Sequence, residues 1–128
     1  MKKEDVKFLY CKHCGNLVEM IDPSGVEIIC CGEPMEELEV KTADTGVEKH
    51  LPVVEKDGDL WTVTVGEVLH PMTPEHHIQW IAVVEDDKVQ RVSLSATDEP
   101  KATFHVKGDA YVYSYCNLHG LWRVSVNK

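Results

Sequence analysis

The 128-residue sequence lacks a long apolar run, and its first residues lack the features of a targeting segment. A membrane-spanning helix needs roughly 18 or more consecutive apolar residues, and no stretch of that length is present. The opening residues, MKKEDVKFLYC, contain lysines but neither an apolar core segment nor a small-residue cleavage site. We therefore expect a soluble cytoplasmic protein that does not act in a membrane.

Clusters of basic residues are also missing. The chain has 13 Lys and Arg against 22 Asp and Glu, which gives a formal net charge of −9. A nucleic-acid surface needs grouped Lys and Arg side chains that neutralise phosphates, so this composition excludes that class of partner. Internal repeats, heptad patterns and low-complexity stretches are absent, and helix signals are weak.

Short segments rich in β-branched and aromatic residues recur along the chain instead. Examples are residues 60–65, 77–84 and 110–115, with turn signals at 57–59 and 107–109. About seven such segments follow residue 45, joined by short turns, and this pattern predicts a sandwich of two antiparallel sheets. The expected fold class is therefore mainly β.

Two units are predicted, one at residues 1–37 and the sandwich at residues 38–128. The first unit has too few apolar residues for a useful core of its own, so its fold is expected to depend on a metal. Residues 41–46 are polar and show no hydrophobic periodicity, which favours a linker between the units.

Four of the five cysteines lie within the first 31 residues at metal-ligand spacing. An odd number of cysteines fits poorly with a secreted disulfide framework, and a disulfide between the adjacent Cys30 and Cys31 would strain the peptide. Cys11 and Cys14 form a knuckle in which Gly15 permits a tight turn around the sulfurs. Four thiolates suit either zinc or one iron, so the spacing predicts a metal but leaves its identity open.

A second group of candidate ligands is scattered over the rest of the chain. Cys116 and His119 form a C-x-x-H pair after an aromatic strand, and His50 precedes another strand. The loop that starts at His70 is rigid because it holds two prolines, and either His76 or His77 can supply a further ligand, since neighbouring strand residues point to opposite faces. Mostly nitrogen donors with one soft sulfur point to a redox metal such as iron rather than a structural zinc.

Read in order, these motifs resemble those of the desulfoferrodoxin family, the two-iron form of superoxide reductase. The resemblance rests on five blocks, namely YCKHCGN at 10–16, CCGEPM at 30–35, EKHLPV at 48–53, the HPM to WI segment at 70–81 and YCNLHGLW at 115–122. It implies a desulforedoxin-like N-terminal domain with one iron on Cys11, Cys14, Cys30 and Cys31. It also implies an immunoglobulin-like sandwich with a second iron on His50, His70, His76, His119 and Cys116.

The resemblance further implies one-electron reduction of superoxide to hydrogen peroxide at the second iron. Glu48 would cap the oxidised iron, and Lys49 would attract superoxide and help deliver protons. A rubredoxin-like or other small protein would donate electrons to a homodimer. Three alternatives stay open: a non-catalytic electron carrier, a structural module with zinc at both sites, and a superoxide dismutase, which must cycle in both directions. Whether incidental zinc or calcium ions bind is undecided.

Overall fold

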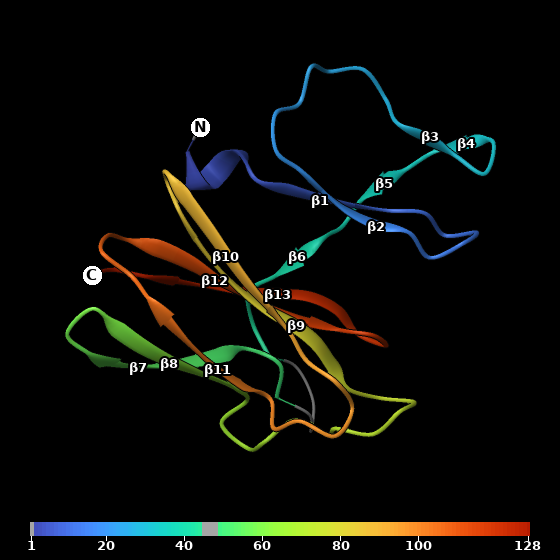
Figure 1. Ribbon diagram of the computed structural model, residues 1–128. Helices are drawn as coiled ribbons and strands as arrows, with labels where there is room; N and C mark the ends of the chain where they lie inside the picture. The colour runs from blue at the N-terminus through green and yellow to red at the C-terminus, as the bar shows by residue number, and fades with distance from the viewer. Residues whose placement is uncertain (1, 45–48) are drawn as a thin grey trace.

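The computed structural model describes residues 2–44 and 49–128, and its architecture is a β-sandwich with a small N-terminal unit beside it (Figure 1). Within the described residues, seven strands follow His50: β7 (Pro52–Asp57), β8 (Leu60–Val65), β9 (Ile78–Glu85), β10 (Lys88–Ser93), β11 (Lys101–His105), β12 (Ala110–Cys116) and β13 (Gly120–Val126). Together with β6 (Val40–Lys41), they form two sheets, of order β10-β9-β12-β13-β6 and β11-β8-β7. The predicted mainly-β fold class is confirmed.

The core between the two sheets is built from strands such as β8, in which buried and more exposed residues alternate. On β8, Trp61, Val63 and Val65 are fully buried, while the residues between them are partly exposed. Ile81 and Val83 of β9 belong to the same buried cluster from the opposite sheet. Side chains of successive strand residues point to opposite faces, so every second residue can enter the core. Removing this apolar surface from water is the main favourable term for the fold.

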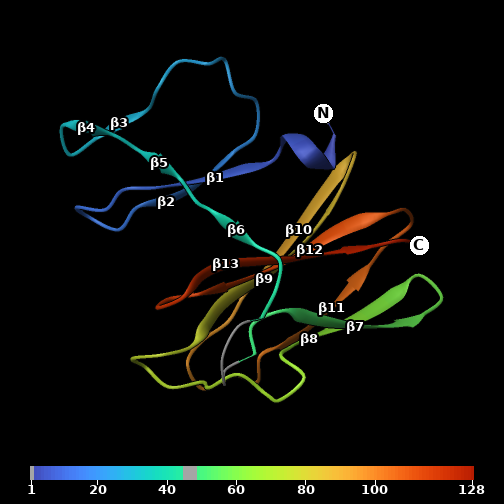
Figure 2. The same cartoon turned by 180° about the vertical axis from the view of Figure 1, so that it is seen from behind.

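Strand β9 departs from alternation because both of its faces are covered. Its residues are nearly all buried, and Trp80 lies on the face that points away from the main core. Phe8 of β1 (Lys7–Tyr10) packs there, with its ring centroid 5.1 Å from Trp80 and 5.3 Å from that of Tyr113. The N-terminal unit therefore acts as a third layer on the outer face of the five-stranded sheet (Figures 1 and 2).

The N-terminal unit consists of short strands that leave much apolar surface exposed. It contains η1 (Lys3–Asp5), a 3₁₀ helix, then β1 paired with β2 (Leu17–Met20) and β5 (Glu36–Glu37), and a hairpin of β3 (Ile29–Cys30) and β4 (Glu33–Pro34). Ile21, Val26 and Ile29 are 66%, 77% and 60% exposed. A unit that buries so few of its apolar groups is consistent with the expected dependence on metal.

Among the described residues, no helix is long and apolar enough to cross a membrane.

One short strand connects the two parts of the molecule. β6 (Val40–Lys41) comes two residues after β5 and pairs in parallel with β13, where Lys41 lies opposite Trp122. Lys41 was expected in a linker, but it lies in this edge strand. The sequence pattern missed β6 because two residues are too few to show any periodicity. The pairing places the start of the sandwich beside the turn between β12 and β13.

Candidate metal centres

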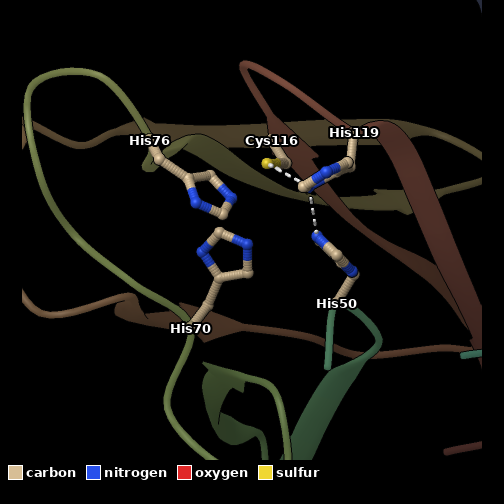
Figure 3. Close-up of side chains that lie close together, drawn as sticks. All are labelled: His50, His70, His76, Cys116 and His119. Atoms are coloured by element: carbon tan, nitrogen blue, oxygen red, sulfur yellow. Dashed lines mark hydrogen bonds between the residues drawn. The ribbon is translucent and has the colours of Figure 1, made fainter. Parts of the chain in front are cut away.

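Four histidines and one cysteine meet at one end of the sandwich, and we refer to them as the histidine site. They are His50, His70, His76, Cys116 and His119, and their ligand atoms all lie within 4.8 Å of one another. His50 comes just before β7, and His70 and His76 lie in the loop between β8 and β9. Cys116 ends β12 and His119 precedes β13, so three separate segments bring the five donors around a common space (Figure 3).

The distances between donor atoms fit one metal ion. Nε2 of His50 is 3.2 Å from Nδ1 of His119, and this nitrogen is 3.7 Å from Sγ of Cys116. Metal–nitrogen bonds of about 2.1 Å separate adjacent ligand atoms of one ion by about 3 Å, and a longer metal–sulfur bond widens the separation. The donor set therefore matches what a single borderline or redox metal requires.

The five side chains of the histidine site differ in how deeply they are buried. The Cys116 side chain is fully buried, and His50 and His70 are 4% and 3% exposed. His119 is exposed and His76 is half-buried. Nδ1 of His70 lies 2.8 Å from the Pro71 carbonyl oxygen. A carbonyl oxygen only accepts, so Nδ1 carries the proton, and the lone pair of Nε2 is left to bind a metal. The sulfur is therefore shielded from solvent, and His119 is the most exposed member of the group.

Hydrogen bonds of Asn117 connect the loop that contains His70 and His76, here called the histidine loop, to the turn that carries Cys116 and His119. Its side-chain oxygen accepts a hydrogen bond from the backbone N–H of His77 at 2.9 Å, and its side-chain nitrogen donates to the Glu75 carbonyl at 2.9 Å. The backbone N–H of Asn117 also donates to the His77 carbonyl at 3.2 Å. The amide thus holds the residues on both sides of His76. Nothing in the sequence pattern marked Asn117 beyond its place inside the C-x-x-H motif.

His76 and His77, between which the sequence pattern left a choice, lie differently in the structure. His76 lies with the other four donors, whereas His77 is outside the group and its backbone is bound by Asn117. Strand β9 starts only at Ile78, so the preceding loop, rather than strand alternation, orients His76. His13 of the cysteine knuckle lies outside both donor groups, with Nε2 2.9 Å from the carboxylate of Glu33.

Lys49 is held close to the loop that follows β8. Gly66 has a φ of +88°, and a Cβ there would lie 2.7 Å from the Lys49 carbonyl oxygen and would also clash with the Val68 carbonyl. Only glycine accommodates both this backbone conformation and this close approach. Gly66 therefore allows the backbone of Lys49, next to His50, to approach this loop closely. Glu48, the other residue expected beside the site, lies outside the described residues.

The second donor group is the four-cysteine site, formed by Cys11, Cys14, Cys30 and Cys31. Gly15, at a φ of +83°, closes the knuckle, and its N–H donates to the Cys11 carbonyl at 2.8 Å. The sulfurs of Cys14 and Cys30 are 3.6 Å apart. A tetrahedral ion with metal–sulfur bonds of about 2.3 Å separates its sulfurs by about 3.8 Å, so the spacing fits one tetrathiolate metal.

The pKa values of Cys11, Cys30 and Cys31 are shifted by hydrogen bonds within the four-cysteine site. The pKa of the Cys11 thiol is lowered to about 6, chiefly because the backbone N–H of Cys14 donates to its sulfur. The pKa of Cys31 is raised to about 12, chiefly through its hydrogen bond with the sulfur of Cys14. The pKa of Cys30 is raised as well, mainly by Cys11. Four thiolates repel one another, and a bound metal cation removes this cost.

The mainly-β chain thus contains two groups of candidate metal ligands, one of four cysteines and one of four histidines and a cysteine, and each could hold one metal ion. The chain belongs to the desulfoferrodoxin family. The family model described as desulfoferrodoxin matches residues 42–125, and the model of the desulfoferrodoxin N-terminal domain matches residues 4–38. The resemblance predicted from the sequence blocks is confirmed.

Similar proteins match over most of the chain. The desulfoferrodoxin homolog of Archaeoglobus fulgidus is 48% identical over 114 residues, which covers 88% of this chain and 91% of that protein. The desulfoferrodoxin homolog of Methanothermobacter thermautotrophicus is 49% identical, with 88% and 92% covered. The crystal structure of the superoxide reductase from Treponema pallidum superimposes with a TM-score of 0.77 at 35% identity, covering 94% of this chain and 98% of that one.

Proposed function

We propose that this chain is a superoxide reductase that converts superoxide to hydrogen peroxide at an iron bound in the histidine site. The observation that carries the proposal is the convergence of four imidazoles and one thiolate within 4.8 Å. A structural zinc site is usually closed by four tetrahedral ligands, so a fifth donor favours a redox metal. The likeness to the superoxide reductase from Treponema pallidum supports the same activity.

Five side chains would hold the metal, and their charges suit an anionic substrate. Iron bound there would supply the one electron that superoxide needs, and two protons complete hydrogen peroxide. His50, His70, His76 and His119 bind as neutral imidazoles, and Cys116 contributes a single negative charge as thiolate. Their sum leaves a divalent ion net positive, which attracts an anion. The thiolate of Cys116 donates electron density to the metal, as an axial cysteine does in haem proteins.

We propose that Lys49 steers superoxide to the histidine site. It directly precedes the proposed ligand His50, and its backbone packs closely against Gly66. An ammonium group on the residue next to a ligand would attract superoxide and could supply a proton. We propose that Glu48 closes the open side of the site in the oxidised protein.

The four-cysteine site is proposed to hold a second iron that stores one electron. Residues 1–37 would form the unit of this centre, and residues 38–128 the catalytic sandwich. A rubredoxin-like or other small protein would supply electrons to a cytoplasmic homodimer. The chemistry at the histidine site does not require the first centre, so its loss should spare superoxide consumption by the prereduced protein.

Metal analysis combined with a visible spectrum tests the proposal. The purified protein should contain two irons per chain and show thiolate-to-iron absorption from both centres. Cys116→Ser should remove the absorption of the histidine site only, and Cys14→Ser that of the four-cysteine site only. A colourless protein with zinc at both sites would overturn the proposal.

The rate of superoxide consumption tests the role of Lys49. Lys49→Ala should slow the reaction at low ionic strength while the iron spectrum stays unchanged, and the difference should shrink as salt screens the charge. Lys88 on the edge strand β10 is exposed, so Lys88→Ala is the matched control for a lost positive charge. Equal rates for the two variants would remove Lys49 from steering.

A further inference from the structure

Trp122 of β13 contacts two of the proposed ligands at once. Its indole stacks on the imidazole of His50, with ring centroids 4.4 Å apart and an interplanar angle of 8°. Its Nε1–H donates to the backbone carbonyl of His119 at 3.1 Å. Trp122 is only 5% exposed, so the indole is held by its surroundings. One buried side chain therefore constrains the ring plane of His50 and the backbone of His119.

Lys41 reaches the same place from a different element. Its Nζ donates to the His119 carbonyl at 2.8 Å and lies 5.1 Å from the centroid of the Trp122 ring. Parallel pairing of β6 with β13 sets Lys41 directly opposite Trp122. The His119 carbonyl thus accepts two hydrogen bonds, one from an ammonium and one from an indole. This arrangement requires β6, the strand that the sequence pattern did not reveal.

We propose that Lys41 and Trp122 are positioning residues for the histidine site, and that the charge of Lys41 tunes the reduction potential of the metal there. The inference rests on the proposed function, because it takes His50 and His119 to be metal ligands. Neither Lys41 nor Trp122 belongs to the donor group itself. Both act through His50 and His119, as outer-shell groups that orient ligands do.

Two separate effects follow from the contacts of Lys41. Loss of its hydrogen bond leaves the His119 carbonyl with the Trp122 bond alone, so the His119 backbone is held less firmly and the metal should bind less tightly. Outer-shell changes of this kind typically cost about 10- to 100-fold in affinity. Loss of its charge favours the more positive oxidised metal, so the reduction potential should fall. A purely structural role for Lys41 would not change the potential in this direction.

Lys56 provides a matched control, because it makes the same pair of contacts elsewhere. It lies on β7 opposite Trp61, with Nζ 5.4 Å from the ring centroid and 2.5 Å from the Asn127 carbonyl. Neither Trp61 nor Asn127 belongs to a donor group. Lys56→Met therefore removes a lysine of equal chemistry without touching the ligands.

The first test measures Co²⁺ binding to the metal-free full-length protein. Binding at the histidine site is the absorption that Cys116→Ser lacks, and the four-cysteine site is the internal reference. Lys41→Met should weaken Co²⁺ binding at the histidine site about tenfold or more, whereas Lys41→Arg and Lys56→Met should bind like the parent chain. Trp122→Phe, which keeps a ring but loses the Nε1–H, should also bind more weakly.

The second test measures the reduction potential of the iron-loaded protein by spectroelectrochemistry. Lys41→Met should lower the potential of the histidine site, and Lys41→Arg should restore it. Unchanged Co²⁺ affinity and potential in Lys41→Met would overturn the inference. Absence of Co²⁺ from the histidine site of the parent chain would instead overturn the proposed function, so the two failures are distinguishable.

Discussion

Replacement of Asn117 by alanine is the change that most directly probes how the histidine loop is held. The side chain makes two hydrogen bonds of 2.9 Å, to the residues before and after His76. Each such bond contributes about 1 kcal/mol, so Asn117→Ala should cost about 2 kcal/mol. If the metal-binding arrangement of the loop loses this free energy, the metal affinity of the histidine site drops about 30-fold, because about 1.4 kcal/mol corresponds to a tenfold change in affinity.

The assay is a competition between the protein and a chelator of known affinity, followed by the absorption that depends on Cys116. Asn117→Asp keeps the acceptor for the His77 N–H but loses the donor to Glu75, so its affinity should lie between those of the parent chain and Asn117→Ala. Asn127 is exposed near the C-terminus, and Asn127→Ala should change nothing. Parent-like affinity in Asn117→Ala would refute the view that this amide positions His76.

Three further changes have expected outcomes. Phe8→Ala should lower the free energy of unfolding by about 3 kcal/mol in urea titrations, because it empties the contact with Trp80 and Tyr113. Gly66→Ala should slow superoxide consumption as Lys49→Ala does, because a Cβ there clashes with the Lys49 backbone. The pKa of Cys31 is raised to about 12 and that of Cys30 is raised as well, so Zn²⁺ must displace protons from the four-cysteine site at neutral pH, and its affinity should fall steadily as the pH is lowered. Below pH 6 the fall should become steeper, because Cys11, with a pKa of about 6, then also holds a proton.

The sandwich was predictable because its strands carry their own signals. Alternation on β8, for example, directly reports which residues enter the core. The sequence of β9 is also apolar, but it does not indicate which residues cover the second face of this strand. That role belongs to Phe8, more than seventy residues earlier in the chain, and a contact at such separation leaves no local pattern.

The donor residues were predictable in type, whereas their support was not. Cysteine and histidine spacing pointed to ligands, and the family resemblance selected His76. Asn117, Trp122 and Lys41 carry no signal of their own, because their roles come from hydrogen bonds and stacking across separate strands. The ligand assignments and the unit boundary at residue 37 stay predictions; metal binding tests the first, and folding of the separate units tests the second.

The products of superoxide consumption test the central claim most directly. The fully reduced protein is mixed with superoxide without oxygen, and peroxide, oxygen and metal oxidation are counted together. A reductase forms one hydrogen peroxide for each superoxide and each electron lost from the histidine site, with no oxygen released. Oxygen formed in step with peroxide would identify a dismutase, and no consumption would identify an electron carrier; either result contradicts the proposed activity.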